Sequence, residues 1–237
     1  MPLDLSRIRG LCFDIDGTLS DTDDAMVFRL NKLLRVVRWA FPAQDSKPFA
    51  RWMVMAIESP GNFLMGIPDR FGLDDELNSL ISAVQKRTAG KKQANFWIIP
   101  QVQETLEKLH PHFPMAVVSA RNQEGTQSFL EQYHLVHFFH SIVTAQTCRY
   151  TKPYPDPILW AAQQMNVSPQ DCLMIGDTTV DIRAGKAAGA QTVGVLCGFG
   201  TEKELRRAGA DLIIPSPVHL IEVLQPLFTH SISIEKG

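Results

Sequence analysis

The sequence predicts a doubly wound α/β fold, built on a parallel sheet. Short apolar runs alternate along the chain with stretches of helical periodicity. The runs are almost continuously apolar and do not alternate with polar residues, which indicates strands covered on both faces. A third observation, a long helical interval after the first strand, predicts an inserted second domain.

Six apolar runs are the expected strands, and most lie in the C-terminal half: 10–15, 114–120, 141–145, 171–176, 191–196 and 211–215. Six segments between and after them have the apolar spacing of helices: 101–110, 122–134, 156–166, 179–188, 202–208 and 217–227. Strand and helix therefore alternate over the whole second half of the chain, as in a sheet with helices on each side.

The interval 20–99 breaks this rhythm. It contains no convincing strand, but apolar residues recur at helical spacing in 25–41 and again in 74–87. About eighty residues between two strands is far more than a crossover connection requires. We therefore expect an α/β core formed by 1–19 and 100–237, and an all-helical domain inserted at 20–99.

Composition limits the partners and the location of the protein. The 237 residues carry 23 Lys and Arg against 25 Asp and Glu, a net charge of -2, and no basic run suits nucleic acid or a membrane surface. No apolar run reaches the roughly 20 residues of a membrane span, and the N-terminus lacks the pattern of a signal peptide. We expect a cytoplasmic protein with buried thiols at Cys12, Cys148, Cys172 and Cys197. The sequence sets no expectation for the oligomeric state.

Two carboxylates end the first predicted strand, in the stretch "LCFDIDGTL". Side chains at positions i and i+2 of a strand share a face, so Asp14 and Asp16 are expected to point the same way. Gly17 lets the backbone turn sharply just after them. Open α/β sheets bind ligands at this carboxyl edge, although Asp and Gly are also common in plain turns.

Other strands end in matching chemistry. "VVSAR" places Ser119 at the end of the second strand, and "IGDTTVD" places Asp177 and Asp181 after the fourth. Together with Asp14 and Asp16, these carboxylates would repel one another and take up protons unless a cation held them ionised. Ligation by oxygen alone suits a hard ion, and Mg²⁺ fits best.

Lys152 lies in "TKPYPDP", where three alternating prolines restrict the backbone. We expect a stiff extended lead into a helix that begins near Asp156. Taken singly, Lys152 and Ser119 are ordinary loop residues. Their occurrence in this order, each after a predicted strand, favours a shared site.

Four ordered motifs resemble those of the haloacid dehalogenase superfamily of hydrolases, and the similarity continues through 194–220. The motifs are "DIDGTL", "VVSAR", "TKPYPDP" and "IGDTTVDIRAGKAAGA". The insert at 20–99 resembles the helical C1-type cap of phosphoglycolate phosphatase-like members. The resemblance implies a Rossmann-like core, Mg²⁺, and phosphoryl transfer through an aspartyl-phosphate.

The same resemblance gives roles to individual residues. Asp14 matches the nucleophile, and Asp16 matches the general acid/base that protonates the leaving oxygen and then activates water. Ser119 is expected to hydrogen-bond the transferring phosphoryl group, and Lys152 to offset its charge. Ala120 and Arg121 are expected to contact the substrate with them.

The predicted metal ligands follow from the resemblance as well. They are the side chains of Asp14 and Asp177 and the backbone carbonyl of Asp16, with Asp181 outside direct ligation or reaching the ion through water. Two positions depart from the family's usual pattern. Ser119 is followed by Ala-Arg where many relatives carry Asn or Gly, and Gln101 stands where relatives often have glycine.

The predicted function is Mg²⁺-dependent hydrolysis of a small phosphate monoester, with a small phosphorylated metabolite as partner. A dehalogenase is disfavoured because those members lack the second aspartate, since a halide leaving group needs no proton. A phosphomutase shares all four motifs and stays open. The insert argues against a receiver-like phospho-aspartate module, and the intact motifs argue against a non-catalytic binding protein.

Overall fold

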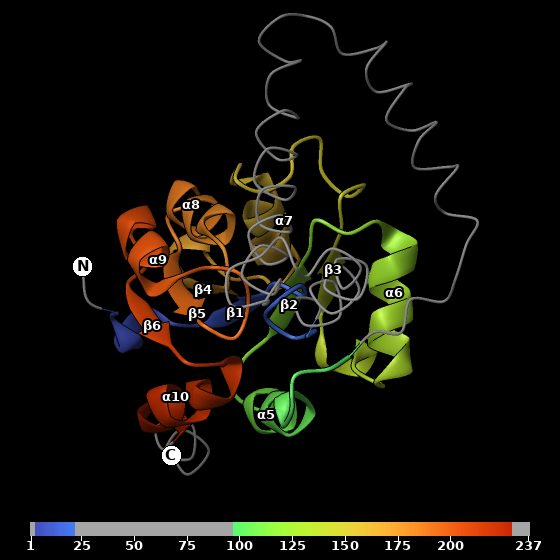
Figure 1. Cartoon of the computed structure of the whole chain (residues 1–237), viewed down its shortest axis with the longest axis horizontal. Helices are drawn as coiled ribbons and strands as arrows, with labels where there is room; N and C mark the ends of the chain where they lie inside the picture. Colours follow the sequence, from blue (N-terminus) through green and yellow to red (C-terminus); the bar gives the residue numbers. More distant parts are fainter. Residues whose placement is uncertain (1–2, 22–96, 229–237) are drawn as a thin grey trace, which may run out of the picture. The chain divides into compact units, whose positions relative to one another are not determined.

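In a computed structural model, residues 3–21 and 97–228 are described, and six parallel strands form one sheet in the order β3-β2-β1-β4-β5-β6 (Figure 1). The strands are β1 (Gly10–Phe13), β2 (Met115–Val118), β3 (Ser141–Val143), β4 (Cys172–Gly176), β5 (Gln191–Val195) and β6 (Leu212–Ile214). Each lies within one of the runs expected from the sequence, so the predicted parallel sheet is confirmed.

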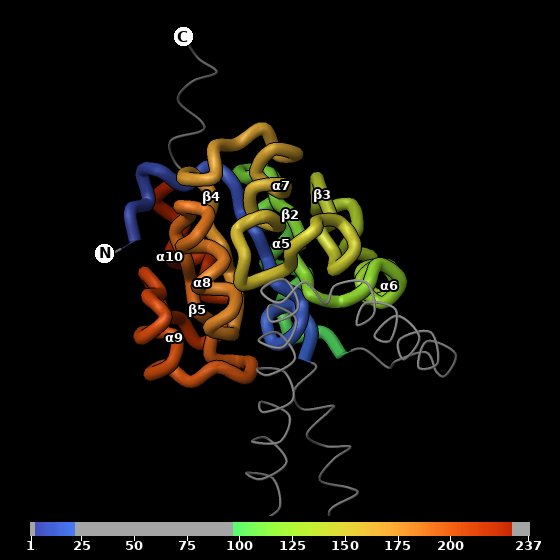
Figure 2. Tube along the Cα trace, turned by 90° about the horizontal axis from the view of Figure 1, so that it is seen from above, coloured from blue at the N-terminus to red at the C-terminus, as the bar shows by residue number. Residues whose placement is uncertain are grey.

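The helices of the described residues cover both faces of the sheet. They are α5 (Val102–Leu109), α6 (Gln123–Gln132), α7 (Asp156–Gln164), α8 (Thr179–Ala187), α9 (Glu202–Ala208) and α10 (Leu220–Phe228), with short 3₁₀ turns η1 (Leu5–Arg7), η4 (Val136–Phe138), η5 (Pro169–Asp171) and η6 (Pro217–His219). Figures 1 and 2 show α7 and α8 on one side of the sheet and α5 and α10 on the other.

Burial on both faces explains the continuous apolar runs. On the side of α7, the strand residues Cys12, Ala116 and Met174 pack with Ile158 and Ala161 of that helix. All four residues of β1 and all five of β4 are buried, so neither face of these strands meets water. All four cysteines are free thiols, two of them buried and two half-buried.

The strand order reverses beside β1. The chain runs from β1 outward to β2 and β3, then returns past β1 to β4 and continues outward to β5 and β6. Such a reversal marks the ligand-binding position in open α/β sheets, at the carboxyl ends of the strands. Phe13 of β1 pairs with Ile175 of β4, so Asp14 and Asp177 follow neighbouring strand ends.

The proline-rich stretch before α7 differs from its prediction. It was expected to be extended, but the Tyr154 amide donates to the carbonyl of Thr151 at 3.0 Å and closes a turn. The Lys152–Pro153 peptide bond is cis. The helix begins at Asp156, as predicted.

The predicted helical cap at 20–99 lies outside the described residues, except for its two ends. Ser20 and Ile98 form an isolated antiparallel bridge, and the amide of Asp21 donates to the carbonyl of Trp97 at 2.7 Å. The two ends of the segment therefore run side by side, while the domain boundaries stay a prediction. Within 3–21 and 97–228, none of the helices has the length and apolarity needed to cross a membrane.

Gln101 stands where relatives often have glycine, and it directly precedes α5. Its backbone is in the left-handed region, with φ 65°. Its carbonyl accepts the amide of Thr105 at 3.0 Å, so the first turn of α5 depends on this conformation. A side chain in the left-handed region costs roughly 1–2 kcal/mol, which glycine avoids.

Gln101→Gly is therefore expected to raise the free energy of unfolding. The relief of backbone strain exceeds the roughly 0.4–1 kcal/mol that glycine costs through the unfolded chain, which leaves a gain of about 0.5–1 kcal/mol. Urea denaturation measures it. Gln103→Gly, at an exposed position in the first turn of α5, is the matched control and should lower stability by up to about 1 kcal/mol. A loss of stability in both variants would contradict the prediction.

Asp211, just before β6, joins three elements of the fold. It accepts two hydrogen bonds of 2.5 Å from Lys186 of α8, and one of 2.8 Å from the amide of Thr192 in β5. Burial opposes ionisation of Asp211, but the bonds from Lys186 and Thr192 outweigh it and hold its pKa below the ordinary 3.8. The ionised carboxylate therefore ties α8 and β5 to the start of β6.

Asp211→Asn is expected to lower the free energy of unfolding at pH 7 by about 1–3 kcal/mol, since it weakens charge-assisted bonds. Because the folded-state pKa lies below the unfolded value, the stabilisation is present above about pH 4 and is lost as pH falls through the folded pKa. The difference between variant and wild type should thus shrink below about pH 4 in denaturation curves. Glu202→Gln, in an exposed pair with Arg206, should change stability by less than about 0.5 kcal/mol. An Asp211→Asn effect that is equal at all pH values would contradict the assignment.

Candidate functional site

Asp14, immediately after β1, is the centre of the site. Only 5% of its surface is exposed, and its backbone amide is bonded to the carbonyl of Ile175, which fixes it between β1 and β4. Its Oδ1 accepts a 2.5 Å bond from Lys152 Nζ. A buried carboxylate with one ammonium partner is an unusually reactive group, because little solvent stabilises its charge.

Lys152 is also 5% exposed, and it binds three oxygens. Besides Asp14, its Nζ donates to the carbonyl of Val118 at 2.9 Å and to Asp181 Oδ1 at 2.6 Å. Asp14 follows β1, Val118 ends β2 and Asp181 lies in the first turn of α8, so one ammonium group joins β1, β2 and α8. The predicted convergence of these loops is therefore present in the structure.

The two charges shift each other's protonation. Burial, helped by the nearby charges of Asp181 and Asp16, raises the pKa of Asp14 to about 7, although Lys152 opposes the rise. Burial lowers the pKa of Lys152, but the charges of Asp14 and Asp181 outweigh it and raise the pKa above its ordinary value. Lys152 thus stays a cation, and Asp14 needs more positive charge to stay fully ionised at neutral pH.

Asp181 is held by its own helix as well as by Lys152. Its Oδ2 accepts the amide of Thr178 at 3.0 Å and the hydroxyl of Thr178 at 2.6 Å, which forms a capping box at the start of α8. The cap satisfies backbone donors of α8 and fixes the Asp181 rotamer. Asp181 thereby holds Lys152 against Asp14.

Asp177 is fully buried and is held by hydrogen bonds from a glycine-rich loop after β5. Its Oδ2 accepts the amide of Phe199 at 2.7 Å, and its carbonyl accepts the amide of Gly200 at 3.1 Å. A Cβ at Gly198 or at Gly17 would overlap the Asp177 carboxylate, so glycine at both positions allows this close approach.

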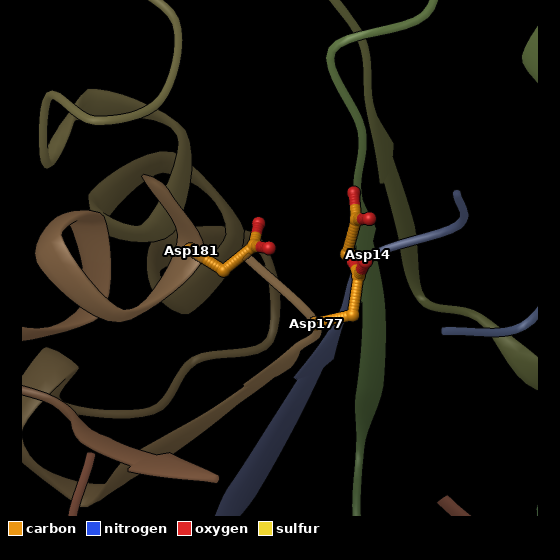
Figure 3. Close-up of side chains that lie close together, drawn as sticks. All are labelled: Asp14, Asp177 and Asp181. Atoms are coloured by element: carbon orange, nitrogen blue, oxygen red, sulfur yellow. The ribbon is translucent and has the colours of Figure 1, made fainter. Parts of the chain in front are cut away.

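Three carboxylates converge on one small space. Asp14, Asp177 and Asp181 each offer an oxygen, and these oxygens lie within 4.8 Å of one another. Figure 3 shows the Asp181 carboxylate, from α8, turned toward the other two. Oxygen donors of this kind fit a hard divalent cation such as Mg²⁺. The ionised cluster contains three carboxylates and one cation, Lys152, which leaves an excess of two negative charges.

Asp16, by contrast, turns to Arg121 and lies outside this carboxylate cluster. Arg121 Nε donates to Asp16 Oδ2 at 2.7 Å, and one terminal nitrogen donates to Oδ1 at 2.5 Å. The predicted metal contact of Asp16 was its backbone carbonyl, which this pairing leaves unaltered. Asp16 and Asp14, two residues apart, therefore have different cationic partners.

The remaining predicted site residues lie at the end of β2. Ser119 is 4% exposed, and its hydroxyl accepts the amide of Arg121 at 3.1 Å. Its own amide donates to the carbonyl of Val143 at 2.9 Å, which fixes the loop to β3. Ala120 is exposed.

Sequence reasoning missed two features of this site. One is the hydrogen bond from the Phe199 amide to Asp177. The two glycines of "CGFG", directly after a predicted strand, were a signal from which this contact could have been predicted. The other is the partner of Arg121. Its position two residues after Ser119 placed it near the site, but no sequence pattern indicated that it would pair with Asp16.

Comparison with known proteins gives consistent relatives. The family model described as haloacid dehalogenase-like hydrolase matches residues 11–195. Phosphoglycolate phosphatases of Shigella boydii and Escherichia coli are each 26% identical to the chain over 92% of its length and 92% of theirs. The solved structure of a hydrolase from Pseudomonas syringae matches with a TM-score of 0.68 at 24% identity, over 92% of this chain and 98% of that one.

Gly198→Ala is expected to weaken divalent-cation binding by about 10- to 100-fold, because its methyl group would displace the Asp177 carboxylate. Calorimetric titration with Mg²⁺ measures the change. Gly10→Ala is the control, since its Cβ would meet only the side-chain ends of Met165 and Val167, at 3.3 Å and beyond. Equal Mg²⁺ affinities in Gly198→Ala and wild type would contradict the role given to the loop.

Proposed function

The chain belongs to the haloacid dehalogenase-like hydrolase family, and from this premise we propose that it is a Mg²⁺-dependent phosphatase of small phosphate monoesters. The observation that carries the proposal is the buried Asp14 carboxylate, bonded to Lys152 and within 4.8 Å of further carboxylate oxygens. This arrangement supplies a nucleophile and fixed charges around the position of a phosphoryl group.

In the first step, an oxygen of Asp14 attacks phosphorus and the bond to the ester oxygen breaks. The leaving oxygen takes a proton from Asp16, so the alcohol departs neutral and the phosphoryl group stays on Asp14 as an acyl-phosphate. Lys152 stays protonated and offsets charge on the phosphoryl oxygens. The Ser119 hydroxyl orients the same group by a hydrogen bond.

In the second step, Asp16, now a carboxylate, removes a proton from a water molecule. The water oxygen attacks phosphorus, the bond between phosphorus and Asp14 breaks, and inorganic phosphate forms. Asp14 returns as a carboxylate and Asp16 regains its proton. Each group thus ends the cycle in its starting form.

Asp14, Asp177 and the backbone carbonyl of Asp16 would hold Mg²⁺, with Asp181 beside them. When bound, the ion supplies positive charge that offsets the negative charge of the carboxylates and of the phosphoryl group. The fit rests on the all-oxygen donor set and on the excess of two negative charges in the site. The Phe199 amide keeps one Asp177 oxygen fixed and so orients the carboxylate.

The first substrate to test is 2-phosphoglycolate, because the Shigella and Escherichia relatives are phosphoglycolate phosphatases. We further propose that the segment 20–99 is a helical cap that limits substrates to small phosphorylated metabolites, and that the protein acts in the cytoplasm. Hinges are expected near 20–22 and 98–101, where the Ser20–Ile98 bridge joins the two linkers.

Release of inorganic phosphate from a panel of small esters, with and without Mg²⁺, tests the proposal. Asp14→Asn is expected to lower the rate by more than about 10³-fold, because the nucleophile is lost. Asp16→Asn is expected to lower it by roughly 10²- to 10⁴-fold, because proton transfer is lost in both steps. Asp171→Asn, a partly exposed aspartate next to β4, is the control and should keep wild-type activity.

The same assay separates hydrolysis from phosphoryl migration. A phosphomutase would form an isomeric ester without free phosphate, which ³¹P NMR of the reaction mixture detects. Wild-type protein that releases no phosphate from any ester in Mg²⁺, or release that survives in Asp14→Asn, would refute the proposed function.

A further inference from the structure

The pairing of Arg121 with Asp16 has consequences for which ester the site accepts. The two bonds, of 2.7 and 2.5 Å, form a planar fork in which each Asp16 oxygen faces a guanidinium nitrogen. The Arg121 side chain is 13% exposed and that of Asp16 is 28% exposed. The fork thus lies at the border of the buried site, with its carboxylate on the more accessible side.

Proton transfer draws Asp16 away from the fork. Asp16 has to present an oxygen to the leaving group in the first step and to water in the second. In the fork both oxygens face the guanidinium, so turning either one toward the leaving group or water weakens a bond to Arg121.

Arg121 also has contacts that do not involve Asp16, and these keep its guanidinium in place when the Asp16 carboxylate moves. Its guanidinium lies over the ring of Phe129, 5.5 Å from the centroid. Its amide donates to the Ser119 hydroxyl, and its carbonyl accepts the amide of Ala145 at 2.9 Å. Asp16 is followed by Gly17 at φ 73°, in a turn.

The Arg121 guanidinium is largely removed from water. Loss of an anionic partner by such a group costs free energy, and a new anion in the same place restores it. The best replacement for a planar carboxylate in a two-pronged contact is another planar carboxylate. Because Asp16 reaches the leaving oxygen, a group that takes its place on Arg121 lies within a few bonds of that oxygen.

We propose that Arg121 is a specificity-determining residue whose fork, released by Asp16, binds a carboxylate carried by the leaving group one or two carbons from the ester oxygen. This inference rests on the proposed function and narrows it to phosphate esters of small hydroxy acids. The substrate carboxylate thereby frees Asp16 for proton transfer, so an ester that lacks it is both bound and processed less well.

A matched pair of esters tests the proposal. In 2-phosphoglycolate the leaving group carries a carboxylate, and in 2-hydroxyethyl phosphate a neutral hydroxymethyl group of similar size replaces it. We expect wild type to prefer 2-phosphoglycolate by roughly 10- to 100-fold in kcat/KM, which is the effect on kcat/KM expected of one charge-assisted hydrogen-bonded pair. Arg121→Gln should reduce the preference to about threefold or less, chiefly through 2-phosphoglycolate.

Two further variants sharpen the result. Arg149→Gln removes an equal charge at an exposed position over Tyr150, and should keep the wild-type preference. Arg121→Lys keeps the charge without the planar fork, and should lose most of the preference. It also serves if Arg121→Gln fails to fold, which circular dichroism melting shows.

Binding is measured separately from turnover, so failure of this inference and failure of the proposed function are distinguishable. Calorimetry with Mg²⁺ compares both esters on Asp14→Asn, with and without Arg121→Gln. A binding preference that disappears with Arg121 supports the inference even if no ester is hydrolysed.

Several results would overturn the inference. One is a wild type without preference for 2-phosphoglycolate, and another is a preference kept in both Arg121→Gln and Arg121→Lys. An equal loss with both esters would mean that Arg121 only positions Asp16 or contacts the transferring phosphoryl group. Absence of binding of either ester to Asp14→Asn and to wild type would overturn it as well.

Discussion

The three hydrogen bonds of the Lys152 ammonium are the interaction on which the site depends. Nζ joins Asp14, Asp181 and the carbonyl of Val118, and so ties together segments that are far apart in the sequence. A buried ammonium is tolerated only with such partners, and removal of one member of a buried pair costs roughly 3–5 kcal/mol. The strand ends are thus held in register by charge as well as by the sheet ladder.

The same contacts leave the centre with an excess of negative charge. One ammonium faces Asp14 and Asp181, and Asp177 adds a third carboxylate close by. A site evolved for stability alone would not bury these groups together, because each added carboxylate makes ionisation of Asp14 less favourable. Rigid supports keep the group assembled: the capping box of α8 holds Asp181, and the loop after β5 holds Asp177. The negative charge is then available to a cation and, through it, to an anionic substrate.

The sequence predicted the sheet and the convergence of the site, because both follow from local rules. Continuous apolarity indicated strands buried on two faces, and the carboxyl ends of parallel strands meet at one edge. It did not predict which cation pairs with which carboxylate. Arg121 and Asp16 are far apart in the chain, and the choice between a metal, a substrate and a neighbouring side chain depends on angles that no spacing encodes. The prediction of an extended segment at 151–157 was wrong for a related reason: prolines restrict φ, but the hydrogen bond from the Tyr154 amide to Thr151 closes a turn. The cap lies outside the described residues and stays a prediction.

The two aspartates of "DID" differ in what holds them, and this difference suits the two separate tasks that the proposed function gives them. Asp14 is buried and bonded to a lysine that is itself fixed by two further oxygens, so its position is constant, as attack on phosphorus requires. Asp16 is more exposed and is bonded to an arginine through two bonds that a second carboxylate can replace. A nucleophile needs one position, whereas an acid/base that serves first the leaving oxygen and then water needs freedom to exchange partners. Lysine beside the first aspartate and arginine beside the second meet these opposite needs within three residues of chain.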